Sequence, residues 1–324
     1  MSITTKEISW RGRSYLKLLI NKLNLVYPPI TNQEGAWLWN VPEVRDFVKG
    51  SKLYMIGHRE ELKFINEQFI SEGRGIIQFQ LATATHKSPI IQIFLYHCLP
   101  DIEDEISIEL GEKLFRIKDS QGNVLQWYTP DILLYRYWKN QLSIRIIDDT
   151  EFNYRDFTRY ELYYVGISKN NDSFSRLFDE SHHARLKILT NEYPKSSGRL
   201  TDELLIFMFE IDKLNINIFD RIEDIDEQIN YHTEDEIAII ADAEKAFIKL
   251  LETKYNEVKY KNYPNGDDGL YSEGLDRYCF YIGEDITFYT TKGDFIGASD
   301  VHDHADMIFV EGEVAKVVKE TIDS

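Results

Sequence analysis

The sequence predicts an α+β protein: a small mixed sheet flanked by helices, with an N-terminal α+β domain over residues 1–140 and a β-rich extension over residues 261–324. Apolar residues at helical spacing alternate with short β-branched and aromatic runs bounded by turn formers. The chain has 324 residues, enough for two domains of ordinary size. Its hydrophobic content of 43% is enough to pack a core in each.

Residues 1–140 alternate between helical and extended patterns. Apolar spacing predicts helices over residues 15–23, 41–48 and 58–65, the last closed by Gly73 and Gly75. Runs of β-branched and aromatic residues predict strands at 75–81 and 89–95, and the runs 115–118 and 124–128 around Gly122 predict a hairpin. No motif in this region carries chemistry.

Residues 141–260 form a second predicted unit. Strands are expected at 142–147 and 162–166, followed by a helix from 174 to about 190 and a third strand at 204–209 that is apolar at every position. A long helix over 234–251 completes the unit, with Thr233 and Glu236 as a capping box. The strands predicted at 278–281, 286–289 and 307–310 would form a small C-terminal sheet.

Composition limits the functional classes. The net charge of −18 disfavours non-specific binding of nucleic acid, unless the acids are segregated from a locally basic site at 185–195 and 254–261. The alternative is that the acidic surface binds a partner protein. Cys98 and Cys279 are predicted to be reduced thiols. No signal peptide or apolar membrane span is visible, so we expect a cytoplasmic location and no membrane partner.

Two stretches of the second unit carry a recognisable pattern. Glu244 lies on the long helix, and Tyr255-Asn256 follow at its end, with Asn256 twelve residues after Glu244. Tyr164-Val165-Gly166 lies upstream, with Arg176 on the next helix. Over roughly residues 142–260, this combination resembles the two halves of a GIY-YIG nuclease site. The competing structural interpretation is an ordinary core-facing stripe of Ala243, Phe247, Ile248 and Leu251 with Glu244 at its solvated edge.

The resemblance implies a role for each matching residue. Glu244 would bind one Mg²⁺ or Mn²⁺, Arg176 would contact the scissile phosphate, and His182 or His183 would assist. Asn256 would orient either the substrate or the residues that surround it. No Gly-Ile-Tyr precedes Tyr164, so Tyr154, ten residues earlier, is the expected replacement for the first tyrosine. The candidate catalytic residues are Tyr154, Tyr164, Arg176, His182, His183, Glu244 and Asn256, and the candidate substrate-binding residues are Gly166, Arg185, Lys187 and Lys249.

The function implied by the resemblance is a metal-dependent endonuclease that hydrolyses DNA, with RNA as a second choice, in restriction or phage defence. By analogy with such nucleases, residues 1–140 would recognise the substrate or a partner. The alternative is a catalytically inactive module of the same fold that binds a protein. Phosphate-loop, dinucleotide and serine-esterase motifs are absent from the sequence. Residues 300–306 contain metal-ligand residue types, for which an exposed polar loop and a second metal or pH-sensitive contact are competing interpretations.

Overall fold

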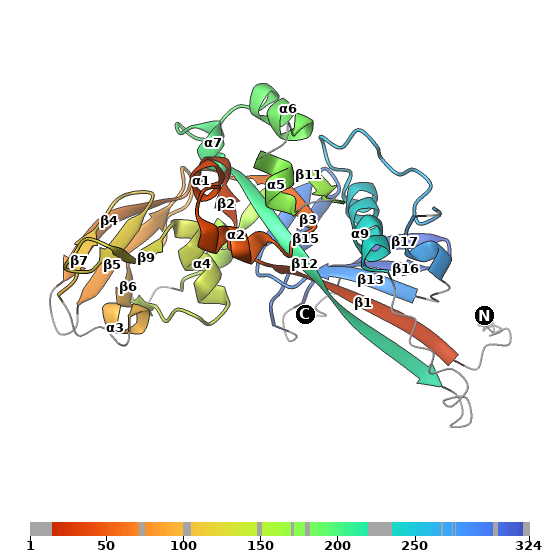
Figure 1. Cartoon of the computed structure of the whole chain (residues 1–324), viewed down its shortest axis with the longest axis horizontal. Coiled ribbons are helices and arrows are strands. Elements are labelled where there is room, and N and C mark those ends of the chain that lie inside the picture. The colour runs from red at the N-terminus through yellow and green to blue at the C-terminus, as the bar shows by residue number, and fades with distance from the viewer. Residues whose placement is uncertain are drawn as a thin grey trace, which may run out of the picture.

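The protein is α+β, as predicted. The structure, a computed structural model, describes residues 15–70, 75–99, 105–147, 151–169, 172–178, 182–219, 235–266, 268–273, 275, 277–300 and 304–319. The strands of the main sheet are β1 (Tyr15–Leu25), β2 (Ile30–Thr31), β3 (Leu53–His58), β11 (Arg159–Ile167), β12 (Leu204–Phe219), β13 (Arg277–Ile282), β14 (Thr287–Thr290), β15 (Gly293–Ile296), β16 (Met307–Glu311) and β17 (Val314–Val318). Their order is β15-β14-β11-β3-β12-β1-β13-β16-β17, with β2 paired to β12 (Figure 1).

The centre of the main sheet is the antiparallel trio β11-β3-β12. Every residue of β3 is buried, and the run Leu-Tyr-Met-Ile-Gly-His is apolar apart from His58, as a strand covered on both faces requires. Beyond the trio, the second half of the long strand β12 pairs with β1, which in turn pairs with β13 (Figure 1). The trio therefore provides the rigid platform on which the helices lie.

Helices cover both faces of this platform. They are α1 (Asn32–Leu38), α2 (Pro42–Val48), α5 (Ser173–Phe178), α6 (His183–Asn191), α7 (Leu200–Glu203) and α9 (Glu236–Leu251), with 3₁₀ turns η1 (Tyr154–Phe157) and η2 (Leu270–Glu273). Buried side chains of α9, such as Phe247, belong to one apolar cluster, whereas Phe174 of α5 and Ile188 of α6 belong to a second one. The two clusters lie on opposite faces of β3, because Met55 packs in the first and Ile56 in the second.

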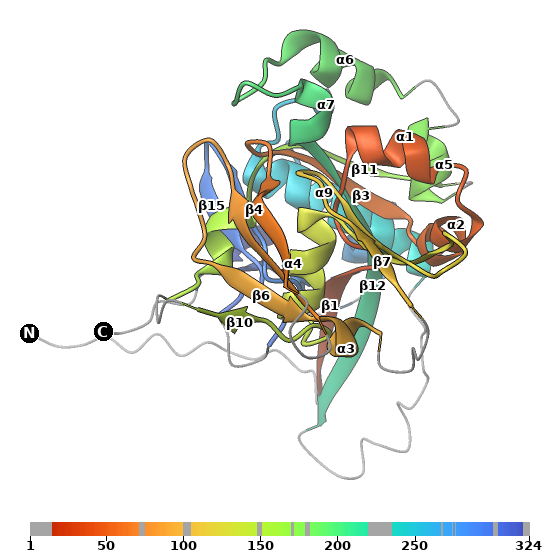
Figure 2. The same ribbon diagram turned by 90° about the vertical axis from the view of Figure 1, so that its left-hand side faces the viewer.

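A large insertion separates β3 from β11 in the sequence. Its elements are β4 (Lys63–Ile70), β5 (Ile76–Ala82), β6 (Ile91–Phe94), α3 (Leu95–Cys98), β7 (Ser107–Glu109), β8 (Phe115–Lys118), β9 (Val124–Tyr128), α4 (Pro130–Trp138) and β10 (Arg145–Ile146). They build two smaller sheets, β10-β6-β5-β4 and β7-β8-β9. Figure 1 shows these sheets at one end of the molecule, away from α9, and Figure 2 views the molecule from that end.

Several sequence predictions are confirmed at the level of elements and others are wrong. The strands expected at 75–81 and 89–95 and the hairpin at 115–128 are present, as is the helix α2. The helix predicted over residues 15–23 is instead β1, which is held between β12 and β13. The helix predicted over 58–65 is the end of β3 and the start of β4. In both segments, pairing with distant strands overrode a local apolar spacing that is compatible with a helix.

The sheet topology does not follow the predicted division of the chain. The main sheet takes strands from the N-terminal, central and C-terminal parts, because β1 pairs with both β12 and β13 and β14 pairs with β11. The predicted strand at 142–147 is the short β10, which joins the insertion sheet. The N-cap of α9 is Asp235, whereas the predicted cap Thr233 lies outside the described residues. In the part of the chain that the structure describes, no helix is both long and apolar enough to cross a membrane.

Candidate functional site

A polar cleft of about 260 Å³ opens where α5, α6 and α9 meet beside β11. It contains most of the residues that the sequence singled out. Its lining residues are Tyr164, Arg176, His182, His183, Ala184, Lys187, Glu244, Ile248, Tyr255, Asn256, Glu257, Val258 and Tyr260. Glu244 and Arg176, which come from helices on opposite faces of the sheet, thus share one cavity.

Glu244 is held at the edge of the buried stripe of α9. Ala243 and Phe247 are fully buried against the sheet. Glu244 and Ile248 each follow one of these residues on the helix, so they lie beside the buried stripe and line the cleft. Burial raises the pKa of the Glu244 carboxyl to about 7, against the opposing effects of a hydrogen bond from Tyr260 and the charge of Lys169. The neighbouring cations therefore do not compensate the charge of the carboxylate.

A β-bulge places two consecutive tyrosines on one face of β11. The register between β11 and β3 shifts between Leu162 and Tyr164, which leaves Tyr163 without a partner residue on β3. Tyr163 and Tyr164 both pack against the same apolar cluster, although alternate residues of a strand normally face opposite sides. The bulge thereby turns Tyr164 toward the cleft while Tyr163 stays buried.

A chain of hydrogen bonds fixes the orientation of Tyr164. His182 is the N-cap of α6, and its Nδ1 accepts from the backbone N–H of Arg185 at 2.9 Å. When Nδ1 of a neutral imidazole accepts a hydrogen bond, the ring proton is on Nε2. Nε2 of His182 lies 2.7 Å from the hydroxyl of Tyr54 on β3. Burial, followed by the charge of Glu244, raises the pKa of Tyr164, and a hydrogen bond from Tyr54 acts in the opposite sense. Tyr164 is therefore protonated at neutral pH, and the hydrogen bond from Tyr54 holds its phenol oxygen in position.

The side chain of Arg176 reaches the cleft because its neighbours anchor α5. Phe174 and Leu177 are fully buried, and Ser173 is tied to Ser51 by a backbone and a side-chain hydrogen bond. The positive charge of Arg176 lowers the pKa of both Tyr164 and Tyr54, although burial outweighs it in each. The guanidinium therefore acts electrostatically at the same place as Glu244.

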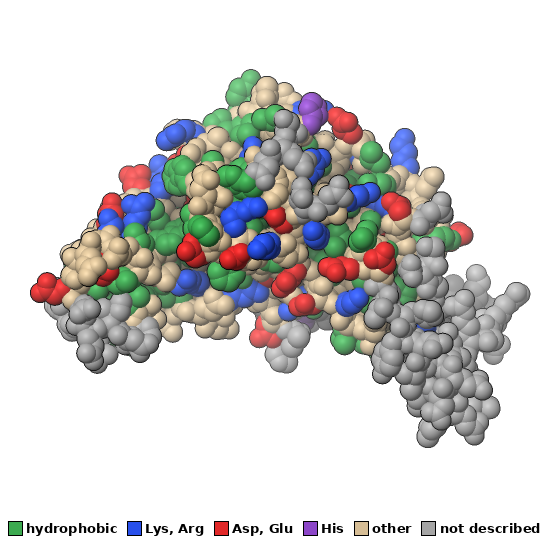
Figure 3. All heavy atoms as spheres, in the orientation of Figure 1, with side chains coloured by type: hydrophobic (Ala, Val, Ile, Leu, Met, Phe, Trp, Pro, Cys, Tyr) green, Lys and Arg blue, Asp and Glu red, His purple; other side chains and the backbone are tan. Residues whose placement is uncertain are grey.

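The remaining charges at the cleft nearly balance. Lys187 forms an ion pair with Glu257 at 3.3 Å, and both side chains are largely exposed. His183 is exposed, whereas its neighbour His182 is buried. Figure 3 shows that the face carrying α5 and α9 mixes basic and acidic side chains. The overall acidity of the chain is therefore not concentrated at this face.

Asn256 lines the cleft and is hydrogen-bonded to the backbone of β11. Its Nδ2 donates to the carbonyl of Val165 at 2.7 Å, and its Oδ1 accepts from the Val165 N–H at 3.0 Å and from the Thr253 hydroxyl at 2.8 Å. The N–H of Tyr255 donates to the carbonyl of Tyr163. The Tyr-Asn pair thus binds the segment after α9 to β11 at the bulge. The amide is engaged with the backbone, which favours the second of its two expected roles, that of positioning the residues around the site.

Asn256→Ala should destabilise the protein by about 2–4 kcal/mol, because it removes three hydrogen bonds and leaves the buried backbone groups of Val165 unpaired. Chemical denaturation would measure the loss. The exposed residue Asn191 at the end of α6 supplies the control, since Asn191→Ala should change stability by less than about 0.5 kcal/mol. A variant of Asn256 with native stability and reduced substrate binding would instead show that Asn256 orients the substrate directly.

Gly166 also serves packing and does not line the cleft. A Cβ atom at this position would lie 2.6 Å from a ring carbon of Tyr164 and 2.7 Å from the hydroxyl of Tyr54. The strand can therefore hold both tyrosine rings over it only if residue 166 lacks a side chain. The glycine of the Tyr-Val-Gly motif makes room for the two phenols.

Gly166→Ala should displace one or both rings and reduce any cleft-dependent activity at least tenfold, with a stability loss of about 1–3 kcal/mol from overpacking. Rates and thermal unfolding should be measured together. Gly50→Ala is the matched control, because a Cβ there meets no atom within 4 Å. Unchanged activity in Gly166→Ala would show that the tyrosine arrangement is not required.

Three further predicted residues lie away from the cleft lining. Tyr154 packs edge-on against Tyr137, and its hydroxyl donates to Asp285, so it does not replace the missing first tyrosine. Arg185 stacks on Phe178 and donates to Asn32 at 3.3 Å. Lys249 lies in the last turn of α9 and does not line the cavity. Arg185 and Lys249 are thus not among the residues that line the cleft, because helix position alone does not fix which way a long side chain turns.

Two residues of the site were missed in the sequence. Tyr54 stands opposite Gly166 across the β3-β11 pair, and Tyr260 donates to Glu244 at 3.4 Å. Tyr54-Met55-Ile56-Gly57 resembles Tyr164-Val165-Gly166 in composition, which was the available signal for Tyr54. Spacing instead favoured Tyr154, ten residues before Tyr164, whereas the intervening insertion places the partner strand β3 far upstream. No local signal marks Tyr260.

The donor set of the cleft fits one hydrated divalent cation. Glu244 supplies a single carboxylate, and no group of three or more His, Cys, Asp or Glu side chains suited to a metal occurs among the described residues. Magnesium commonly keeps several waters and needs only one or two protein carboxylates beside a phosphate. Of the predicted His/Asp cluster, residues 301–303 lie outside the described residues, and Asp306 accepts a hydrogen bond from the backbone of Ile296.

Comparison of the chain with protein-family models, with curated proteins and with solved structures gives no match. The geometry of the cleft is accordingly the basis for any functional argument.

Proposed function

We propose that this protein is a metal-dependent endonuclease that hydrolyses phosphodiester bonds of DNA with a GIY-YIG type of site. The observation that carries the proposal is the convergence of Glu244, Arg176 and Tyr164 on one cleft, from three elements that lie far apart in the sequence. Two tyrosines on adjacent antiparallel strands, an arginine on the following helix and a glutamate on a later helix are the parts that the resemblance implies.

The side chains divide the work of phosphodiester hydrolysis. Arg176 offers a permanently charged fork that can hold two phosphate oxygens and meet the charge that develops on them. Tyr164, which stays protonated, can donate from its hydroxyl to a water or to a phosphate oxygen while it accepts a hydrogen bond from Tyr54. His183 and Lys187 at the rim can contact the neighbouring backbone phosphates.

Glu244 would hold the cation, because the charges of Lys169 and Lys245 do not offset the effect of burial on this carboxyl, so its carboxylate would be stabilised by a further cation. A bound Mg²⁺ or Mn²⁺ would supply Lewis acidity toward the phosphate and lower the pKa of a coordinated water. Tyr260 donates to Glu244 and so fixes the direction in which the carboxylate presents its lone pairs. The raised pKa of Glu244 further implies that cation binding and loss of its proton are coupled.

The test is cleavage by the purified full-length chain. Plasmid and phage DNA, modified and unmodified, should be cut in the presence of Mg²⁺ or Mn²⁺ and remain intact in EDTA. A panel of labelled RNAs tests the second-choice substrate. If neither DNA nor RNA is cut in either metal, with cell extract added to supply partner proteins, the nuclease proposal is wrong and the inactive interaction module becomes the better account.

A further inference from the structure

The strand β9 differs from the other strands that end a sheet in this protein. Within the described residues, the three sheets end in the strands β15 and β17, β10 and β4, and β7 and β9. Every one of these strands except β9 carries at least one charged residue, whereas β9 reads Val-Leu-Gln-Trp-Tyr. Charged residues on an edge strand prevent it from pairing with another chain. The edge of β9 lacks this protection.

The unprotected edge of β9 borders a cavity of about 640 Å³, which we call the β9 groove. It lies between β9, α2 and α4, and its lining includes Val124, Leu125, Gln126 and Trp127. Successive side chains of a strand point to opposite faces, so a cavity that touches four residues in a row lies along the edge of the strand. Among the described residues, the backbone of β9 is hydrogen-bonded to the backbone of no element other than β8. The outer N–H and C=O groups of β9 are therefore available at the groove.

The other walls of the β9 groove are largely apolar. Phe47 of α2 is 65% exposed, and its ring lies 6.2 Å from that of Tyr27, which also lines the groove. On the side of β9, Val124 and Leu125 are 48% and 37% exposed. Exposed apolar side chains on both sides of an open strand edge favour an occupant that brings apolar side chains of its own.

The positive charge in the β9 groove belongs to Arg136 of α4, which is half-buried. Its hydrogen-bond partners are neutral: the hydroxyl of Tyr128 accepts at 3.1 Å, and the amide of Gln126 accepts at 2.9 Å when its oxygen faces the guanidinium. Arg136 has no ion pair in the part of the chain that the structure describes. The carboxylate of Glu43, at the start of α2, is exposed and is screened by solvent. The groove therefore favours an acidic group at Arg136.

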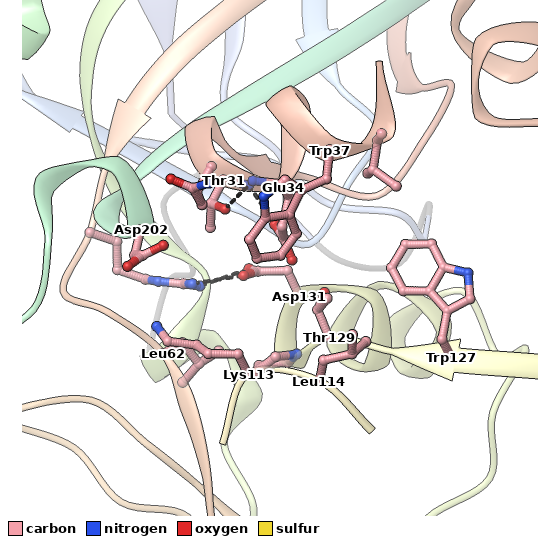
Figure 4. Close-up of a pocket in the computed structure, with 14 residues that line it drawn as sticks. Thr31, Glu34, Trp37, Leu62, Lys113, Leu114, Trp127, Thr129, Asp131 and Asp202 are labelled. Carbon is pink, nitrogen blue, oxygen red and sulfur yellow. Dashed lines mark hydrogen bonds and ion pairs between the residues drawn. The ribbon is translucent and has the colours of Figure 1, made fainter. Parts of the chain in front are cut away.

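A neighbouring cavity shares Trp127 with the β9 groove but differs from it in charge. Figure 4 shows this cavity, with Trp37 of α1 close to Asp131. Asp131 is neutralised by Arg59 through two hydrogen bonds of 3.0 Å, so no uncompensated cation is offered to an acid by this pair. Trp37 is 59% exposed and lies outside the β9 groove, which makes it a matched control for Phe47.

We propose that the β9 groove binds an extended peptide segment of a partner protein. The segment would add a strand to the free edge of β9, pack apolar side chains against α2 and pair one aspartate or glutamate with Arg136. Backbone hydrogen bonds would supply affinity, and the apolar and acidic side chains would supply specificity. The groove contains none of the cleft residues, so this inference does not rest on the proposed nuclease function.

Selection from a library of random twelve-residue peptides, displayed on phage and bound to the full-length protein, tests the inference. We expect the enriched sequences to alternate apolar and polar positions and to contain an acidic residue. A synthetic, fluorophore-labelled copy of an enriched peptide should then be titrated by fluorescence anisotropy. Arg136→Gln in the protein, or replacement of the acid by its amide in the peptide, should each weaken binding about tenfold, and the two changes together should weaken it no further.

Phe47→Ala should also weaken binding of this peptide at least tenfold, whereas Trp37→Ala should leave it unchanged. Both aromatic side chains are exposed, so neither variant is expected to unfold the protein. Failure to enrich any peptide, or binding that is insensitive to both Arg136→Gln and Phe47→Ala, overturns the inference. Concentration-dependent dimerisation of the wild type that Phe47→Ala abolishes would overturn it as well, because a second copy of the chain would then occupy the groove.

Discussion

Glu244→Gln should abolish metal-dependent cleavage, to below about one-hundredth of the wild-type rate, and at the same time make the metal-free protein more stable at pH 8. The loss of activity follows from removal of the anionic ligand. The gain in stability follows from the pKa of about 7 for Glu244 in the folded protein, compared with 4.5 for an ordinary glutamate. An amide at this position carries no charge that burial can penalise.

The sign of this effect can be worked out from proton binding. Between pH 4.5 and pH 7 the folded protein holds the proton of Glu244 and the unfolded chain releases it, so the wild-type free energy of unfolding falls as pH rises through this window. Above pH 7 the full cost of keeping a charged Glu244 buried is present, and it lowers the free energy of unfolding by on the order of 3 kcal/mol. The stability advantage of Glu244→Gln should therefore be largest at pH 8 and vanish near pH 4. Added Mg²⁺ should stabilise only the wild type.

Chemical denaturation in EDTA across this pH range, together with cleavage rates, provides the measurement. Glu252→Gln is the matched control, because Glu252 follows the same helix, is exposed, and pairs with Lys292 outside the cleft. The control should keep both activity and pH-dependent stability. If Glu244→Gln is less stable than the wild type at pH 8, the carboxylate is a structural anchor and not a site for a cation.

Arg176→Ala should reduce the cleavage rate by about 10²–10³ fold, the typical effect of removing one group that stabilises developing negative charge. Arg176→Lys should recover only part of this loss, because an ammonium cannot present the planar pair of N–H donors. Thermal unfolding should change little in either variant, since the anchoring side chains of α5 are Phe174 and Leu177.

Arg199→Ala is the control for Arg176, because Arg199 is 80% exposed and lies outside the cleft. Its cleavage rate should equal that of the wild type. Full activity in Arg176→Ala would mean that another cation contacts the phosphate, and the proposed arrangement of the site would then be wrong.

The sequence predicted best where a motif lies within one element and its immediate continuation. Glu244, Ile248 and Asn256 belong to α9 and the few residues after it, so helical periodicity and a fixed offset were sufficient to place them in one cleft. The hydrogen-bond partner of Asn256 could not be predicted from this segment alone, because Val165 lies on a distant strand. The same holds for Gly166, whose function depends on the ring of Tyr54.

The sequence predicted worst where an element is defined by its neighbours. The apolar spacing of β1 fits a helix face, yet Leu19 and Leu23 are buried in a strand that pairs on both sides. Tyr54 could not be paired with Tyr164 by spacing, since residues 59–158 lie between their strands. Pairing across such an interval is decided by tertiary packing, which local patterns do not encode.

The insertion between β3 and β11 also determines when the cleft can form. Closing a chain segment of about one hundred residues costs roughly 2 kcal/mol more entropy than closing a ten-residue hairpin. The two phenols are therefore brought together only by long-range contacts, and Glu244 is translated much later than Tyr54. We expect the cleft to be absent from the nascent chain until nearly all of it has been synthesised and folded, so that no fragment of the chain carries the assembled site.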